Sequence, residues 1–450
     1  METIIAEIAG KFIKNICEII ASGVFFAEIE EASLREAKSC AARLVEAYAE
    51  AVDTAVVADR VARRKAGYRV ERRGDERRIQ TQLGEVSYRR TYFQRASGGY
   101  EYVTDTVLGV DKRERVSEGL SLSLVRAAKD MSYAKASAHL TAGEVSRQTV
   151  MGKIRRSYAQ KPVADRRWVA ELHVDADEDH VTLCGGRKSI VPLISVYEGI
   201  ETRGKRGLCK NVFHISEYGN PSEALWEQAL TEVEARYDLD GTKIYLHGDG
   251  ADWIKTGLEW FPNAIFVLDK YHKNQAIKTM TAGLSIAGRK LFNAAIRDAL
   301  SIENTSIVDN LTANLCSISP ARETKITDSA EYLKMHIKGI SICSTDPSAN
   351  NGGCTEPHVS HILSARLSSR PMAWSKRTLK QLAPMLAGGT IRKVPSTTPS
   401  LPAPLQNAAA SARKAFRCRN TRGLPAPNAI GTLPLSGKVT GTQKLLKLFV

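Results

Sequence analysis

Residues 168–176 read WVAELHVDA, and this stretch predicts the first strand of an α/β domain. It is rich in apolar residues and is followed directly by the acidic run DEDH at residues 177–180. Further strand and helix candidates follow it: strands at residues 189–199, 211–219, 243–250 and 264–269, and helices at residues 221–238 and 251–261. The domain therefore opens with three strands and continues as helix, strand, helix, strand.

This order fits a mixed sheet better than a doubly wound parallel sheet. The RNase-H-like fold has the same order of elements. We therefore expect an α/β protein with an RNase-H-like mixed-sheet core, whose first part covers residues 166–270. Helical periodicity predicts a helical insertion at residues 271–345, and residues 346–392 are expected to carry the last helix of the core.

The two ends of the chain differ from this core. Residues 1–66 carry apolar residues at spacings of three and four, which predicts a helical N-terminal region. Prolines lie among Ser, Ala and Thr at residues 393–450, so we expect a tail of low order there.

Residues 67–165 are predicted to form a basic DNA-binding region, which makes the part before the core a mainly helical DNA-binding region. Arginines interleave with aromatic residues around a hairpin turn at Ser97-Gly98-Gly99. Further on, a turn at Gly143 and an N-cap at Ser146 give helix-turn-helix spacing. A hairpin packed on helices, with its arginines in solvent, is an equally weighted alternative. The candidate DNA-binding residues are Arg72, Arg73, Arg77, Arg78, Arg89, Arg90, Arg147 and Gln148.

Charge and cysteine usage narrow the class of protein. The chain has 64 Lys and Arg against 49 Asp and Glu, a net charge of +15, which favours a polyanionic partner such as nucleic acid. Its 8 cysteines contain no CxxC pair, so we expect free thiols in a reducing cytoplasm. The N-terminus lacks the pattern of a secretory signal, and no stretch approaches the roughly 20 apolar residues of a membrane helix. We expect no membrane partner.

Four acidic residues are candidates for a catalytic site. Asp175 and Asp177 are predicted at the end of the first strand, and Asp249 follows the fourth strand between two glycines. Glu356 precedes Pro357, which suits the first turn of a helix. The alternative for all four is a set of polar turns and helix caps with no chemistry.

Clustered carboxylates suit phosphodiester chemistry. Two Mg²⁺ ions about 3.5–4 Å apart can activate a water or 3′-hydroxyl and neutralise the attacked phosphate. Mg²⁺ prefers hard oxygen ligands and keeps several waters, so a few carboxylates are enough to hold it.

Four segments together resemble one known family. LHVDADEDHV, HGDGADWIK, FVLDKYHK and CTEPHVSHILSARLSSRPMAWS are similar to the bacterial ISLre-type insertion-sequence transposases, distant relatives of the mutator-like DDE transposases. The resemblance runs from about residue 80 to residue 390. It implies a catalytic triad of Asp177, Asp249 and Glu356, with Asp175 as the fallback for the first aspartate.

The resemblance also implies a role for a DxxH element, here Asp269 and His272. His272 would bind a phosphate or orient a carboxylate, although a buried histidine bonded to the backbone is the alternative. The expected cofactor is Mg²⁺ or Mn²⁺, two ions held by Asp177, Asp249 and Glu356, with Asp175 as a further candidate.

The function implied is a DNA transposase. It would bind the terminal inverted repeats of its element, cleave and join DNA as a homo-oligomer on element ends and target, and work on the bacterial nucleoid. Pro357 and the tail depart from the family pattern. A transposase-derived DNA-binding protein without catalysis is therefore the first alternative, and a general RNase-H-like nuclease is the second.

Overall fold

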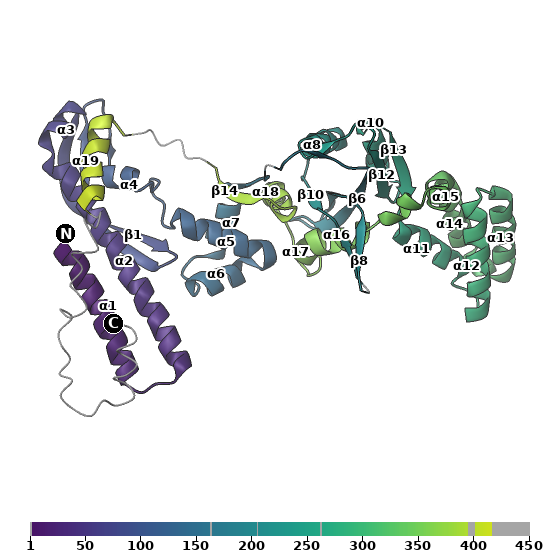
Figure 1. Ribbon diagram of the computed structural model, residues 1–450, viewed down its shortest axis with the longest axis horizontal. Coiled ribbons are helices and arrows are strands. Elements are labelled where there is room, and N and C mark those ends of the chain that lie inside the picture. Colours follow the sequence, from purple (N-terminus) through teal and green to yellow (C-terminus); the bar gives the residue numbers. More distant parts are fainter. Residues whose placement is uncertain (1, 163, 205, 262, 395–400, 416–450) are drawn as a thin grey trace. The chain divides into compact units, whose positions relative to one another are not determined.

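The computed structural model describes residues 2–162, 164–204, 206–261, 263–394 and 401–415. The chain divides into two compact units, residues 1–120 with 395–450, and residues 121–394. Figure 1 shows the elements of both units.

The first unit combines a helical hairpin with a β-hairpin. The long helices α1 (Glu2–Ala21) and α2 (Phe26–Ala58) pack against each other, and α2 covers the β-hairpin. Phe93 of that hairpin and Val52 of α2 are fully buried in the shared core. Between α2 and residue 107 this unit also contains α3 (Arg60–Lys65), β1 (Tyr68–Thr81), β2 (Gly84–Arg95), β3 (Tyr100–Glu101) and α4 (Val103–Val107).

The hairpin differs from the sequence prediction in its main strand pair. β2 and β3 do pair across the predicted turn, with Phe93 opposite Glu101. The longer partner of β2 is β1, which pairs with it antiparallel from Tyr68 to Thr81. We had not predicted β1 as a strand, because arginines fill it and only its ends carry buried apolar residues.

A helix also occurs where we expected a tail of low order. α19 (Ala403–Ala415) packs on α2, with Leu405 and Ala409 buried against Val52 and Val56. Its alanine-rich sequence favours a helix, although the prolines around it are typical of segments of low order. The other parts of that prediction, residues 395–400 and 416–450, lie outside the described residues.

The second unit begins with helices. α5 (Glu118–Asp130) crosses the boundary between the units and is followed by α6 (Tyr133–Thr141) and α7 (Arg147–Ile154). The turn after α6 contains Gly143 with a φ of 91°. Ser146 caps α7, because its hydroxyl accepts a hydrogen bond from Thr149 N at 3.2 Å. The predicted turn and N-cap are confirmed.

A five-stranded mixed sheet forms the centre of the second unit, in the order β10–β7–β6–β12–β13. β7 runs antiparallel to β6 and β10, whereas β12 is parallel to both β6 and β13. The strands are β6 (Glu171–Thr182), β7 (Lys188–Tyr197), β10 (Phe213–Ile215), β12 (Lys243–Gly248) and β13 (Ala264–Leu268). The expected α/β class with a mixed sheet is confirmed.

Helix α8 (Ser222–Glu234) packs on one face of this sheet. Its Trp226 is fully buried among apolar strand residues such as Val174 and Leu246. The indole nitrogen of Trp226 donates to the carbonyl oxygen of Trp253 at 2.7 Å, which satisfies the polar atom of the ring. Short elements complete this region: α9 (Asp252–Lys255), α10 (Gly257–Trp260), and the strand pairs β5 (Arg167–Trp168) with β11 (Tyr237–Asp238) and β8 (Ile200–Arg203) with β9 (Arg206–Cys209).

Residues 270–345 are helical, as predicted for the insertion. The helices are α11 (Lys270–Thr281), α12 (Ile286–Ser301), α13 (Thr305–Ile318), α14 (Glu323–Met335) and α15 (Ile337–Thr345), with a 3₁₀ turn at Pro320–Arg322. These helices, drawn in green in Figure 1, lie next to β13. They share a hydrophobic core with Leu268 of that strand. Lys270 Nζ donates to the carbonyl oxygens of Asn350 at 2.7 Å and Gly352 at 3.1 Å, which ties the start of the insertion to the chain that follows it.

The last part of the second unit returns to the sheet. A 3₁₀ turn (Pro347–Asn351) precedes α16 (Thr355–Val359), a π-helical segment (Ser360–Ser364) and α17 (Ala365–Leu367). α18 (Lys376–Leu386) and β14 (Thr390–Lys393) follow, and β14 pairs with β4 (Ser157–Gln160). None of the helices in the described part of the chain has both the length and the apolar character needed to cross a membrane.

Candidate active site

The register of two parallel strands brings Asp177 and Asp249 level with each other. His247 of β12 lies opposite Asp175 of β6, so Asp249 comes beside Asp177 two residues later. A side chain at Gly248 would not fit there, since its Cβ would lie 3.0 Å from the carbonyl oxygen of Ala176. The absence of a side chain at this position allows the close approach of the two strands.

Strand β6 is longer than we predicted. It continues to Thr182 by pairing with β7 alone, so Asp177 lies inside the strand and not at its end. The acidic run DEDH lies inside the strand although acidic residues are depleted in strands, so its composition does not indicate that β6 continues. Asp177 nevertheless lies beside the carboxyl end of β12, at the edge of the sheet where Asp249 follows that strand.

The loop after β12 fixes Asp249. Gly250 has a φ of 90°, a left-handed conformation that glycine adopts readily. Asp249 Oδ1 accepts a hydrogen bond from Ala251 N at 2.8 Å, and its carbonyl oxygen accepts one from the Tyr332 hydroxyl at 2.7 Å. Among the described residues, only Oδ1 of the Asp249 carboxylate accepts a hydrogen bond, which leaves Oδ2 available to a ligand.

Asp177 is half-buried and has a perturbed acidity. The pKa of Asp177 is raised to about 7, chiefly by burial and in part by the nearby carboxylate of Glu356. Its Oδ1 accepts a hydrogen bond from Glu178 N at 2.8 Å, which opposes this rise. Two carboxylates from distant parts of the chain therefore lie close enough to interact.

Glu356 reaches this place from the first turn of α16. Pro357 occupies the next position in that turn, where a missing backbone N–H does not disturb a helix. The expectation that Glu356 lies near a helix N-terminus is confirmed.

His272 completes the group on the side of β13. Asp269 caps α11 with Oδ1, which accepts from Tyr271 N at 2.7 Å, while Oδ2 lies 2.5 Å from His272 Nδ1. This hydrogen bond raises the pKa of His272, and the charges of Asp177 and Asp249 raise it further. The structure thus brings His272 together with both aspartates, and the bonded partner of the ring is a carboxylate, not the backbone.

Asp175 is placed differently from the other three carboxylates. It is 2% exposed, and both of its oxygens accept hydrogen bonds from the Tyr197 hydroxyl, at 2.9 and 3.0 Å. Oδ2 also accepts from Cys354 N at 2.9 Å and lies 3.2 Å from His358 Nδ1. Asp175 is therefore saturated with partners from the protein itself.

Several residues around the carboxylates were not singled out from the sequence. Asp179 is 5% exposed, and its Oδ1 accepts hydrogen bonds from the hydroxyls of Ser364 at 2.8 Å and Ser368 at 2.7 Å. A strand extended to Thr182 would have shown Asp175, Asp177 and Asp179 on one face, because alternate residues of a strand share a face. Ser364 and Ser368 carry no sequence signal of their own.

A pair of buried histidines lies under the same edge. His173 Nδ1 and His247 Nε2 are 3.0 Å apart, and burial lowers the pKa of His247 to about 4. Gly352 covers both rings, and a Cβ there would lie 2.3 Å from His247 Nε2. This packing leaves no space for a ligand, so we interpret the pair as part of the core.

The donor set can be compared with the expected Mg²⁺ or Mn²⁺. Among the described residues, no three His, Cys, Asp or Glu side chains are arranged so that together they could hold a metal ion. Asp177, Asp249 and Glu356 offer only hard carboxylate oxygens, and the pKa of Asp177 is raised chiefly by burial and, to a lesser extent, by the negative charge of Glu356, both of which a bound cation would offset. The chemistry of these donors fits Mg²⁺ held by few protein ligands.

A family model described as "Uncharacterised protein family (UPF0236)" matches residues 19–395. The chain belongs to the UPF0236 family. Two UPF0236 proteins of Caldanaerobacter subterraneus subsp. tengcongensis are each 33% identical to it, over 84% and 87% of this chain and 80% and 83% of theirs. A UPF0236 protein of Streptococcus gallolyticus is 23% identical over 67% of this chain and 70% of its own length.

This membership corrects the resemblance to the ISLre-type transposases. The matching family model and relatives carry the UPF0236 name, and nothing in their names indicates the ISLre-type family. Short acidic motifs after strands recur in many proteins, so four of them did not suffice to identify a family.

The predicted DNA-binding residues of this UPF0236 protein fall into two groups. Arg90 is 8% exposed and pairs with Asp105, and Arg77 donates to the carbonyl oxygens of Asp111 and Glu114. These two arginines support the unit from inside, which corrects their assignment to a DNA-binding surface. The other six candidates are not buried: Arg72 and Arg78, which pair with Asp75 and Glu76, and Arg73, Arg89, Arg147 and Gln148.

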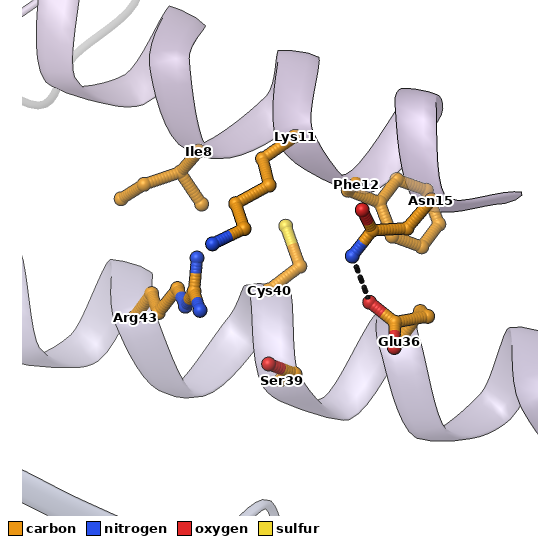
Figure 2. A pocket seen from close by; sticks show the side chains of 8 residues that line it. All are labelled: Ile8, Lys11, Phe12, Asn15, Glu36, Ser39, Cys40 and Arg43. Carbon is orange, nitrogen blue, oxygen red and sulfur yellow. Dashed lines mark hydrogen bonds between the residues drawn. The ribbon is translucent and has the colours of Figure 1, made fainter. Parts of the chain in front are cut away.

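Figure 2 shows a small hollow between α1 and α2 of the UPF0236 protein. Asn15 Nδ2 donates to Glu36 Oε2 at 2.7 Å at one end, and Lys11 and Arg43 point toward each other at the other end. None of its lining residues belongs to the predicted site, and the group of carboxylates remains the candidate active site.

Proposed function

We propose that this UPF0236 protein is a metal-dependent DNA transposase with an RNase-H-like catalytic core. Asp177, Asp249 and Glu356 are its DDE triad, and Mg²⁺ or Mn²⁺ is its cofactor. The protein acts as a homo-oligomer on element ends and target DNA, on the bacterial nucleoid.

The strand order supports the RNase-H-like core. Three antiparallel strands come first, and β12 and β13 then extend the sheet parallel to β6, giving the order β10–β7–β6–β12–β13. This is the order of elements that we expected for that fold. In open α/β sheets, ligands bind at the carboxyl ends of parallel strands, which is where Asp249 lies.

The observation that carries the proposal is the meeting of three carboxylates from three separate elements. Asp177 interacts electrostatically with Glu356, and His272 interacts with both Asp177 and Asp249. A structural role does not require this crowding, which costs folding free energy because it disfavours the charged carboxylates. Perturbed acidity at the carboxyl end of a sheet is typical of functional sites.

Each residue has a role in the proposed reaction. Asp177, Asp249 and Glu356 would hold the metal ions, which supply activation of the attacking oxygen and neutralise charge on the phosphate. Asp269 orients the ring of His272 and favours its protonated form. His272 would then donate a hydrogen bond to a phosphate oxygen of the bound strand.

Surface charge and the helices before the core support a DNA partner. The chain carries +15 net charge, and Arg147 and Gln148 are exposed in the first turn of α7. The first turn of a second helix is where helix-turn-helix proteins contact base edges. The name of one relative joins eleven labels from a single strain, as expected for a gene that copies itself within a genome.

The test is cleavage of the DNA that flanks the coding region of this protein, with Mg²⁺ or Mn²⁺ and the full chain. Asp249→Asn should lose at least about 100-fold in rate, because a ligand of the ions is lost. Asp252→Asn is the matched control, since Asp252 is exposed three residues further along.

Equal activity of Asp249→Asn and the unaltered chain would reject this active site. Specific DNA binding without any metal-dependent cleavage would identify a non-catalytic DNA-binding protein. Cleavage without preference for the flanking DNA would instead indicate a general nuclease.

A further inference from the structure

The carboxylates on one face of β6 have two kinds of surroundings. Asp175, Asp177 and Asp179 alternate along this face. The outer two are buried, at 2% and 5% exposure, whereas the middle one is half-buried. The hydrogen bonds explain this difference, because the outer aspartates bond to a distant segment and Asp177 does not.

That segment comprises residues 354–368 and carries Glu356; we call it the glutamate segment. At its start, Cys354 N donates to Asp175 Oδ2 at 2.9 Å, although the two residues are 179 positions apart in the chain. At its end, Ser364 and Ser368 donate to Asp179 Oδ1 at 2.8 and 2.7 Å. Each end of the segment is thus anchored to a carboxylate two residues from Asp177.

The anchors differ in how they are built. Asp175 is fixed from behind by the Tyr197 hydroxyl, which also accepts a hydrogen bond from Gly353 N at 3.0 Å. Asp179 Oδ2 is buried and has no partner among the described residues, so the two serine hydroxyls on Oδ1 are the side-chain donors to this carboxylate there. Removing the serines would therefore leave Asp179 without a side-chain donor.

The backbone between the two anchors departs from a regular α-helix. Residues Ser360–Ser364 form a π-helical segment, an arrangement that often occurs at functional sites. Ser364 and Ser368 are four residues apart, so both point from one side of the helix toward Asp179. Glu356 lies between the anchors, next to a carboxylate that repels it.

We propose that Asp175 and Asp179 are positioning residues that clamp the glutamate segment onto β6 and so hold Glu356 beside Asp177. They do not bind metal themselves. The inference rests on the proposed function, because Glu356 needs a fixed place only if it shares a ligand with Asp177. It also explains why Asp175, a candidate ligand by sequence, is saturated with protein donors.

The test replaces the two serines and leaves every carboxylate in place. Hydrogen exchange of residues 354–368 is measured on the full chain without metal, and Mn²⁺ binding is measured from the EPR signal of free Mn²⁺. In the double variant Ser364→Ala/Ser368→Ala, we expect exchange at least about tenfold faster in this segment. We expect the Mn²⁺ concentration at half-saturation to rise by about 10–100-fold, as for other groups that orient a ligand.

Three further variants separate positioning from other effects. Ser364→Thr/Ser368→Thr keeps both hydroxyls and should restore exchange and Mn²⁺ binding. Ser360→Ala, an exposed serine in the same π-helical segment, should match the unaltered chain. Asp177→Asn should lose Mn²⁺ binding while exchange of the segment stays slow, since it removes a ligand and not an anchor.

Unchanged exchange, or unchanged Mn²⁺ binding, in the double alanine variant would overturn the proposal. Loss of Mn²⁺ binding in Asp179→Asn with unchanged exchange would make Asp179 a ligand and would also overturn it. If the unaltered chain binds no Mn²⁺, the proposed active site fails, and the positioning role fails with it. Exchange of the segment would still report separately whether the clamp exists.

Discussion

The substitution Asp177→Asn should make the metal-free protein more stable. The ordinary pKa of this carboxyl is 3.8 and burial raises it to about 7, so the folded state holds its proton more tightly than the unfolded state. Between these two values, the folded state loses stability as pH rises, because it must carry a buried charge. Asparagine has no charge to lose, so its advantage grows across the same window.

The magnitude follows from the pKa difference. At about 1.4 kcal/mol per pKa unit, the change from 3.8 to about 7 sets a ceiling of about 4 kcal/mol above pH 7. Because Asp177 is only half-buried, solvent screening reduces this ceiling, and we expect about 2 kcal/mol at pH 8. Well below pH 3.8 the two proteins should unfold at the same denaturant concentration, since the carboxyl of Asp177 is then neutral in both the folded and the unfolded state.

Urea denaturation with EDTA measures this difference through tryptophan fluorescence. All 5 tryptophans lie in residues 168–374, so the signal reports the unit that contains Asp177. Asp298→Asn, at an exposed position on α12, is the control and should change stability little at any pH. Added Mn²⁺ should reverse the order, because only the unaltered chain gains binding free energy. Equal stabilities at pH 8 in EDTA would refute the reasoning.

Three more predictions concern stability, the loop at Asp249 and DNA binding. Arg90→Ala should destabilise the first unit by about 1–3 kcal/mol, because it removes the closer of the two arginines paired with buried Asp105 and a guanidinium stacked on Tyr102, while Arg77 remains 4.0 Å from Asp105. Exposed Arg89→Ala should be near neutral; thermal unfolding followed by circular dichroism checks this, and equal melting would contradict it. Gly250→Ala should lower the free energy of unfolding by about 1–3 kcal/mol more than Gly185→Ala, because both glycines have positive φ but only at Gly250 would a Cβ lie 2.3 Å from a His336 ring atom. Urea denaturation measures both, and equal losses would show that His336 moves aside freely. Arg147→Ala should weaken binding to the flanking DNA by about 1–3 kcal/mol and weaken binding to scrambled DNA less. Fluorescence anisotropy at fixed salt measures both affinities, and an equal loss on both DNAs would show that Arg147 contacts phosphate and not bases.

Much of the second unit could be predicted from the sequence. Its strands have continuous apolar runs, and its helices have clear periodicity, so the order of elements and the mixed sheet followed from the pattern. Asp249 was also accessible to prediction, because its flanking glycines mark a turn after a buried strand. These features depend on local chemistry, which a single sequence displays.

The parts that were missed depend on contacts between distant residues. Strand β1 is held by pairing with β2 and not by its own composition, since most of its side chains are polar. The length of β6 depends on β7, which continues beside it after β12 has ended. The anchoring role of Asp179 depends on serines 185 and 189 residues away. No local pattern encodes such pairings.

The hydrogen bonds from Lys270 to the backbone at Asn350 and Gly352 hold together the two ends of the helical segment of residues 270–345, at one junction with the sheet. The helices between these points fold around their own apolar interior and Leu268, and they leave and rejoin the sheet at one place. In the sequence, Asp177 and Asp249 of the proposed triad precede this junction and Glu356 follows it. A gene interrupted within α12 or α13 would therefore yield two polypeptide fragments, one with both aspartates and one with the glutamate. Neither fragment should be active alone, and their association in one cell would bring the three carboxylates of the proposed triad together again.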